Sequence, residues 1–304
     1  HTLGDARRFA KDVESQMEKG TFEDYSGARG TTLKEILIKY RDEKTVLKKG
    51  AREETSTINF LIRHKISFNS LMRLKSFQIY KLMEELGKTR APATVKKYVV
   101  IICHAWRVAK KEWGINLPAE NPCDMVTLPK VNDARDRILT KSESAKLLDA
   151  CSESNLHMLR DIVVFAMSVG ARQGEILKLK REHIDYEKKL ITFFDTKNDA
   201  DRTIPAPDNV LVILKKYRFG EFVFNTLARR LRKHFTRACK RAEIKDFRFH
   251  DLRAVFCTNA LLSGMSIPEV SAISGHKDWS QLKRYARIKP ADLLDKINNV
   301  VNLK

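Results

Sequence analysis

The chain of 304 residues is 43% hydrophobic and carries a formal net charge of +20. This length suffices for one to three domains with buried cores. The excess of basic residues predicts a polyanionic partner, because each Lys or Arg placed on a phosphate releases condensed counterions. Nucleic acid is the expected partner, and a basic protein kept soluble by charge repulsion is the plainer alternative.

The five cysteines have no CxxC or CxxxC spacing, and their number is odd. This argues against a disulfide framework and a zinc site, and it favours a reducing compartment, the cytoplasm. The longest apolar run, from Ile162 to Ala171, is about half of the roughly 20 residues needed to span a bilayer. No secretory signal pattern is visible either, so we expect no membrane partner and no bound metal.

Two regions are predicted before a linker. Residues 1–30 predict an N-terminal arm helix that ends near Gly20, followed by a glycine-rich break. Residues 31–130 predict an all-helical domain whose first helix is capped by Thr31 or Thr32. Prolines and asparagines between 118 and 132 then indicate an irregular linker, which places a domain boundary near 131–137.

The third region, residues 131–304, begins with a capping box at Thr140 and Glu143. A second helix runs through Asp161–Val169 and stops at Gly170. Short strands are expected at 190–194 and 202–206, on either side of a polar turn. With helices on to the C-terminus, the class is mainly α with a small antiparallel β-sheet.

Two basic helix faces are candidates for contacts with a nucleic-acid backbone. In the helix predicted over 93–112, Lys96 and Lys97 lie off the apolar stripe, and a solvated face and a DNA contact remain equal alternatives. A helix over 227–241 has seven Lys or Arg from Ala228 to Arg241 and no acid, with its apolar positions on one face. Its candidate contact residues are Arg229, Arg230, Arg232 and Lys233, and its apolar positions are Leu227, Leu231, Phe235 and Ala238.

His250 and Arg253 form the pattern His-x-x-Arg. On a helix they share a face, so both heads can reach one phosphate. A guanidinium offers a fixed fork of donors to paired phosphate oxygens, and an imidazole exchanges a proton near neutral pH. Standing alone, the pattern occurs by chance in many proteins, and a salt-bridged or capping surface pair is the favoured interpretation.

Three further positions have both a chemical and a plain interpretation. Arg172 follows the helix stop at Gly170, where free backbone N–H groups favour an anion, or it is a surface arginine with Glu175 available to hold another one. Lys197 lies in the turn between the strands, where a desolvated lysine protonates a leaving oxygen and a solvated one does nothing. His276 lies at a helix junction as a phosphate ligand or a cap.

Tyr285 follows nine residues after His276, in the run Leu-Lys-Arg-Tyr-Ala-Arg. A tyrosine hydroxyl has a pKa near 10, so it attacks phosphorus only when cations stabilise the phenolate or a base takes its proton. The plain alternative is a half-buried aromatic ring on the last helix. The order and spacing of all these positions decide between the two sets of interpretations.

The second half of the chain resembles the tyrosine recombinases, or phage integrases. Their Gly-x-Arg-x-x-Glu motif is found at 170–175 and contains Arg172, and their β-hairpin lysine fits Lys197. Their His-x-x-Arg box fits His250 and Arg253. The Gly-His box and the nucleophile fit His276 and Tyr285. The resemblance covers roughly 31–300, and the match is only loose in the part before the linker. The motif sequences are most similar to those of phage, genomic-island and shufflon-type members.

Two positions depart from the family pattern. The Gly-His box usually begins Leu-Gly-His, whereas Ser274 stands before Gly275 here. Three residues before the tyrosine the family often has Thr, where this chain has Leu282. Neither change removes a chemical group from the mechanism.

The resemblance implies a site-specific recombinase that cleaves and rejoins DNA through a 3′-phosphotyrosine link, for integration, excision or inversion of a mobile element, without a cofactor. Arg172 and Arg253 would bind the scissile phosphate, and His276 would hydrogen-bond to it. His250 would assist removal of the proton from Tyr285, and Lys197 would protonate the departing 5′-hydroxyl. Each role is what the family motif implies for the matching position.

The resemblance also implies an architecture and partners. A helical, SAM-like core-binding domain over 31–130 and a catalytic domain over 131–304 would form a C-shaped clamp on double-stranded recombination sites. Four copies would assemble on DNA, with DNA-bending accessory proteins as possible partners, and the segment Ala291–Val301 would dock on a neighbour or on its own domain. Two rivals remain: a non-catalytic regulator with a helix-turn-helix-like segment over 267–279, and a type IB topoisomerase-like enzyme.

Overall fold

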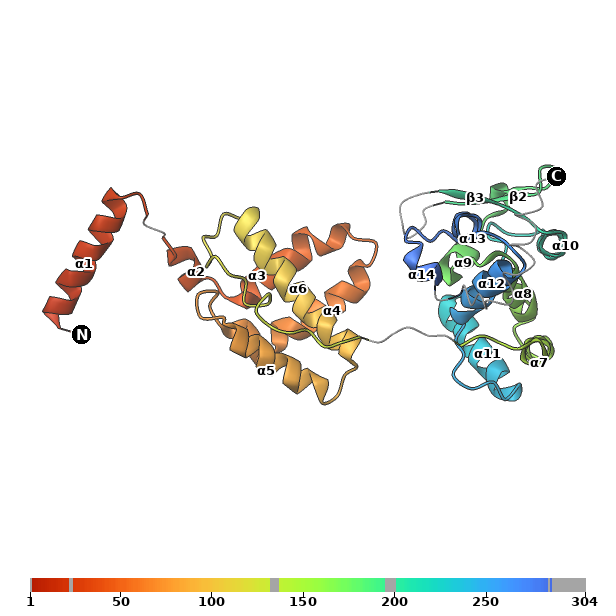
Figure 1. The fold of residues 1–304 in the computed structure, drawn as a ribbon, viewed down its shortest axis with the longest axis horizontal. Coiled ribbons are helices and arrows are strands. Elements are labelled where there is room, and N and C mark those ends of the chain that lie inside the picture. Colours follow the sequence, from red (N-terminus) through yellow and green to blue (C-terminus); the bar gives the residue numbers. More distant parts are fainter. Residues whose placement is uncertain (1, 22–23, 132–136, 195–200, 284, 286–304) are drawn as a thin grey trace, which may run out of the picture. The chain divides into compact units, whose positions relative to one another are not determined.

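The computed structural model describes residues 2–21, 24–131, 137–194, 201–283 and 285. The chain divides into two compact units, residues 1–133 and 134–304 (Figure 1). Helices dominate both units, and the second unit also holds a three-stranded antiparallel sheet. The predicted class, mainly α with a small antiparallel sheet, is confirmed. No helix in the described part of the chain is long and apolar enough to cross a membrane.

The regular elements described in the first unit are helices. They form α1 (Leu3–Glu18), α2 (Ser26–Gly30), α3 (Leu33–Glu43), α4 (Ala51–Arg63), α5 (Ser76–Gly87) and α6 (Pro92–Lys111), with 3₁₀ turns at Thr45–Leu47 and Lys65–Phe68. Of the two threonines expected to cap α3, Thr32 is the cap: its hydroxyl accepts from the backbone of Glu35, whose carboxylate accepts from the backbone of Thr32. The reciprocal bonds fix where α3 begins.

The core of the first unit forms where α3 packs on α4 and α6, and α5 packs on α6. The predicted apolar stripe of α6 is buried along its length, with Trp106 only 2% exposed. Lys96 and Lys97, which lie off this stripe, are exposed. Helix α6 therefore presents one face to the core and a basic face to solvent.

The second unit contains α7 (Lys141–Ser152), α8 (Leu159–Val169), α9 (Gln173–Lys178), α10 (Asp208–Lys216), α11 (Ala228–Arg241), α12 (Asp251–Leu262), α13 (Ile267–Ser274) and α14 (Ser280–Lys283). Its sheet has the order β1 (Ile184–Asp185), β2 (Leu190–Phe193) and β3 (Arg202–Pro205). In the predicted hairpin, Ile191 pairs with Ile204 and Phe193 with Arg202. The two-residue β1 is too short to give an alternating pattern, so the sequence did not predict it.

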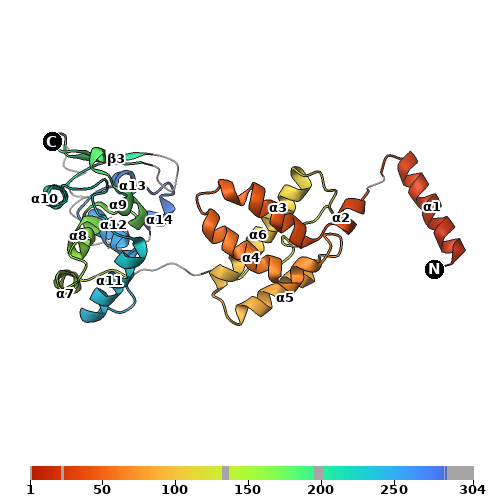
Figure 2. The same cartoon turned by 180° about the vertical axis from the view of Figure 1, so that it is seen from behind.

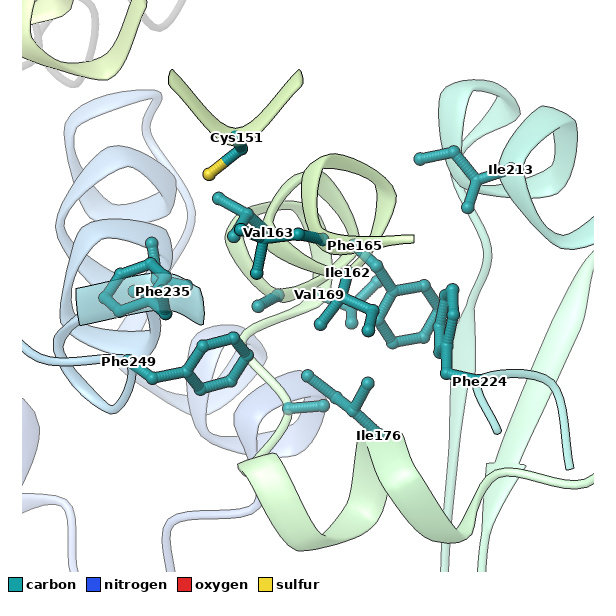
Figure 3. Packing of buried hydrophobic residues seen from close by; sticks show 14 of the residues in the cluster. Cys151, Ile162, Val163, Phe165, Val169, Ile176, Ile213, Phe224, Phe235 and Phe249 are labelled. Atoms are coloured by element: carbon teal, nitrogen blue, oxygen red, sulfur yellow. The ribbon is translucent and has the colours of Figure 1, made fainter. Parts of the chain in front are cut away.

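Helix α8 is the centre of the second unit, in contact with α7, α9, α10, α11 and α12, as Figures 1 and 2 let the reader follow. It is apolar on nearly all sides because neighbours surround it. Figure 3 shows Phe165 of α8 beside Phe224, with ring centroids 5.6 Å apart, and Phe235 beside Phe249, 5.3 Å apart. Both pairs meet edge to face, the geometry that aromatic quadrupoles favour. All five cysteines are buried and free.

Two details of the prediction change, and a third is not tested. Leu227, placed on the apolar face of the basic helix, precedes α11 and is 76% exposed, because the helix begins one residue later at Ala228. In the helix-turn-helix-like segment, α14 spans only Ser280–Lys283 within the described residues, so no second helix of recognition length follows α13 there. The segment Ala291–Val301 lies outside the described residues.

Candidate active site

The site is built around two glycine turns. Helix α8 ends at Gly170, whose φ of 60° is left-handed, and a Cβ there would lie 2.3 Å from Cδ1 of Phe256. Helix α13 ends at Gly275 with φ 73°, and a Cβ there would lie 2.3 Å from Nη1 of Arg202. Only glycine fits both the conformation and the space at these positions. The two turns bring the ends of α8 and α13 against buried side chains.

Arg172 follows the first turn, directly before α9. Its Nη1 donates to Glu175 Oε1 at 2.7 Å, and its Nη2 donates to the carbonyl oxygen of Gly275 at 2.9 Å. The backbone N–H of Arg172 donates to the other oxygen of Glu175 at 2.8 Å. The guanidinium is therefore fixed at both ends while its side chain stays 21% exposed.

Glu175 holds a second arginine, Arg202 at the start of β3. Nη2 of Arg202 donates to Glu175 Oε2 at 3.0 Å and Nη1 to Oε1 at 3.3 Å. Burial acts to raise the pKa of Glu175, but the hydrogen bonds and charge of Arg202, together with the hydrogen bonds of Arg172, more than offset it and hold the pKa below its ordinary value. One carboxylate between two guanidiniums leaves the three groups with a net positive charge.

Arg253 comes from α12 and is 5% exposed. Its Nη1 donates to the carbonyl oxygen of Gly170 at 2.8 Å and also to that of Ser274. Burial, and then the charge of Arg172, lowers the pKa of Arg253 to about 10, which leaves it charged at neutral pH. Its Nη2 is buried and has no hydrogen-bond partner in the described part of the chain. A buried cationic donor without a partner favours an anionic ligand.

His276 follows the second turn. Its Nδ1 lies 2.7 Å from the hydroxyl oxygen of Ser274, and its carbonyl oxygen accepts from the hydroxyl of Ser271 at 2.5 Å. Burial, followed by the charges of Arg253 and Arg172, lowers the pKa of His276 to about 3. The ring is therefore uncharged at neutral pH when no anion is present.

The structure shows fewer contacts for the remaining predicted residues, His250, Tyr285 and Lys197. His250 is exposed at the start of α12, and its charge is among those that lower the pKa of His276. Tyr285 is half-buried and packs against a cluster from α12, α13 and α14 that includes Phe256, Val270 and Leu282. Lys197 lies outside the described residues. The structure thus brings Arg172, Arg253 and His276 together and packs Tyr285 against α12, α13 and α14.

Arg202 is the site residue that the sequence analysis missed. Its side chain is 9% exposed, and its guanidinium carbon lies 4.8 Å from the ring centroid of Phe193. One signal was present: in the strand 202–205, Arg202 alternates onto the same face as the buried Ile204. A buried arginine needs a carboxylate partner, and the sequence had already indicated Glu175 as an acid that could hold a second arginine.

Residues 137–291 match the phage integrase family. The shufflon-specific DNA recombinase of Escherichia coli is 30% identical to the chain over 282 residues, which cover 89% of this chain and 72% of that protein. The chain belongs to the phage integrase family. The predicted resemblance, shufflon-type wording included, is confirmed.

Solved structures share the fold of this phage integrase. The integrase of the Tn1549 transposon in complex with circular intermediate DNA has a TM-score of 0.72 at 16% identity, covering 88% of this chain and 99% of that one. A lambda integrase tetramer bound to a Holliday junction gives 0.70 at 20% identity, covering 87% and 81%. Family membership makes the chain a tyrosine recombinase, an enzyme that cleaves and rejoins DNA strands in site-specific recombination of mobile elements.

The DNA-facing candidates of this integrase are all exposed: Lys96 and Lys97 on α6, and Arg229, Arg230, Arg232 and Lys233 on α11. The opposite face of α11 is buried at Leu231, Phe235 and Ala238. Among the described residues, no group of three or more His, Cys, Asp or Glu side chains is placed to hold a metal ion. Cationic groups are prominent both in the site and on the exposed face of α11.

Proposed function

We propose that Tyr285 is the nucleophile of this recombinase. Its hydroxyl oxygen attacks the scissile phosphorus, the bond from phosphorus to the 5′-oxygen breaks, and a 3′-phosphotyrosine link forms. His250 assists removal of the tyrosine proton, and Lys197 gives a proton to the departing 5′-oxygen. A 5′-hydroxyl then attacks the link in reverse, so the bond energy is conserved and no cofactor is consumed.

Arg172 and Arg253 bind the non-bridging oxygens of that phosphate, and His276 hydrogen-bonds to it. The observation that carries this assignment is the buried, unpartnered Nη2 of Arg253 beside the fixed guanidinium of Arg172. Donors held in place before the substrate arrives stabilise the charge that develops in the transition state without reorganising. The family motifs support the same roles.

The partner is double-stranded DNA carrying recombination sites. The exposed basic residues of α6 and α11 support backbone contacts from both units, the arrangement of a clamp on the duplex. A homotetramer on two duplexes follows from the need for four cleavages, and the lambda integrase tetramer supports it. DNA-bending accessory proteins are compatible partners. The bacterial cytoplasm, where phage and chromosomal DNA lie, is the proposed location.

Covalent trapping tests this function. Duplexes that bind the protein are selected from a randomised library, and a nick is placed beside each possible scissile phosphate so that the cleaved fragment diffuses away. The protein should form a DNA adduct that survives SDS, and Tyr285→Phe should form none while binding the duplex as before. Tyr186→Phe, at a tyrosine 40% exposed in the same unit, is the control and should form the adduct.

The same assay separates the alternatives. No adduct on any selected duplex, or an adduct in Tyr285→Phe, would refute the assignment of the nucleophile. Two duplexes that exchange strands identify a recombinase, whereas relaxation of one supercoiled circle without exchange identifies a topoisomerase. Adduct formation should also continue in EDTA, and its loss there would contradict a mechanism that uses only protein cations.

A further inference from the structure

Two serines of α13 contact His276, at different atoms. Ser271 and Ser274 are both buried, at 7% and 0% exposure. The hydroxyl of Ser271 donates to the carbonyl oxygen of His276, whereas the hydroxyl oxygen of Ser274 lies 2.7 Å from the ring nitrogen Nδ1. The first contact fixes the backbone, and the second acts on the chemistry of the ring.

The hydroxyl of Ser274 also contacts the thiol of Cys257, so the shortest of its contacts decides where its proton lies. Its oxygen also lies 2.5 Å from the carbonyl oxygen of Val270, one helical turn earlier. Two oxygens this close repel unless a proton lies between them, and a carbonyl has none to give. The single hydroxyl proton of Ser274 therefore points at Val270, and a lone pair of Ser274 points at Nδ1 of His276.

We propose that Ser274 is a positioning residue that holds the uncharged ring of His276 as its Nδ1–H tautomer, leaving Nε2 with a lone pair. Nδ1 must carry the proton because it faces a lone pair at hydrogen-bond distance. The family's Gly-His box usually has leucine where Ser274 stands, and leucine accepts no hydrogen bond. The usual Leu-Gly-His form of the motif therefore lacks this contact.

The consequence at the site rests on the proposed function, in which His276 hydrogen-bonds to the scissile phosphate. A phosphate oxygen has lone pairs only, so the uncharged Nδ1–H ring meets it lone pair to lone pair. Binding of the phosphate therefore brings a proton onto Nε2. The resulting imidazolium donates from both nitrogens, Nδ1 to Ser274 and Nε2 to the phosphate.

The charges around the ring explain why this proton arrives only with the anion. Among the described residues, the charges that act on His276 come from Arg253 of α12, Arg172 before α9, His250 before α12 and Arg202 of β3. Burial acts first, and these charges act in the same direction to keep the free ring uncharged. A phosphate anion reverses this balance, so phosphate binding and proton uptake are linked.

Nitrogen-15 NMR of the DNA-free protein at neutral pH tests the tautomer directly, with His276→Gln used to assign the ring signals. In the wild type, Nδ1 should carry the proton and Nε2 should show the shift of a bare nitrogen. In Ser274→Ala, the proton should move wholly or partly to Nε2. A wild-type ring protonated at Nε2, or an Nδ1–H ring that persists in Ser274→Ala, would overturn the proposal.

Ser271→Ala is the matched control, because it removes a second buried hydroxyl from the same helix and the same histidine. It loosens the main chain of His276 without touching the ring, so the tautomer should stay Nδ1–H. A tautomer that changes equally in both variants would mean that general loosening, not the Ser274 hydroxyl, sets it. That result would also overturn the proposal.

Calorimetry tests the proton uptake. A duplex selected by binding is titrated into the Tyr285→Phe protein in two buffers of different ionisation enthalpy. With Ser274 intact, this protein should take up more protons per bound site than the same protein carrying Ser274→Ala, because the ring of the latter already has an Nε2–H form. Equal proton uptake in the two proteins would contradict the linkage. The NMR result requires no activity. If NMR shows the expected tautomer but no covalent adduct forms, only the proposed function is refuted, and the assignment of the tautomer stands.

Discussion

The second unit holds two groups of cations with opposite designs. The first group is largely shielded from solvent: the side chains of Arg172 and Arg202 are 21% and 9% exposed, and Arg253 is buried. Each of the three is held by carbonyl or carboxylate oxygens. The basic residues of α11 are exposed and follow one another without an acid. The first group resembles a preformed phosphate site, and the second resembles a surface that adapts to a backbone.

The energetics of the two groups differ accordingly. A buried charge costs several kcal/mol of desolvation unless partners offset it, and at the site arginines those partners are Glu175 and three carbonyl oxygens. Exposed arginines cost little and gain affinity through counterion release. The buried group should therefore control the rate of cleavage, and the exposed group should control the strength of binding.

Arg253→Gln should give the largest effect on rate. It removes a buried donor, Nη2, that has no partner in the described part of the chain, and loss of a preorganised transition-state donor costs about 10²- to 10³-fold in rate. Single-turnover adduct formation on the nicked duplex measures this at saturating protein. Arg253→Lys keeps the charge and should recover part of the rate. If binding falls as steeply as the rate in Arg253→Gln, the division between the two groups is wrong.

Arg202→Met should give the next largest effect. Without Arg202, the carboxylate of Glu175 pairs with Arg172 alone and neutralises the charge that the phosphate needs. Loss of a partner that orients an active-site group typically costs about 10- to 100-fold. The readout is the same single-turnover rate, measured beside the unfolding temperature.

Arg137→Met is the matched control, because Arg137 forms a part-buried pair with Glu143 in the same unit but outside the site. Both variants lose an arginine–glutamate pair, so their unfolding temperatures should fall together. Only Arg202→Met should slow cleavage. Equal cleavage rates in the two variants would make Arg202 a structural residue.

Much of this site could be predicted from the sequence, because its motifs are local. Gly170 marks a helix end, Arg172 and Glu175 are three residues apart, and His250 and Arg253 are one turn apart. The pairing of Arg202 with Glu175 joins residues 27 positions apart across a strand and a helix. No local pattern reports such a contact. The proton of Ser274 depends on distances of a few tenths of an ångström, which spacing does not encode.

The exposed group should respond to salt. Arg229→Gln combined with Lys233→Gln removes two exposed cations one turn apart on α11. If both contact phosphates, the slope of log affinity against log salt should fall by about 1.8, or about 0.9 for each contact. The cleavage rate at saturation should not change. Arg241→Gln is the control, since Arg241 already bonds to Glu153 and the carbonyl oxygen of Ala150.

The smallest effect should come from pH, and it again compares the two groups. In the folded chain the pKa of His276 is lowered to about 3, chiefly by burial and then by Arg253, whereas the unfolded value is 6.5. Between these two values the unfolded state binds a proton that the folded state does not bind. The free energy of unfolding therefore falls as pH drops from 6.5 towards 3. His276→Gln should flatten the dependence of the unfolding temperature on pH in that range.

The pKa of His234 on α11 is also lowered, first by its slight burial and then by Arg230, but by less. His234→Gln should flatten it less, and an equal or larger effect there would place the stronger cationic field on the surface helix.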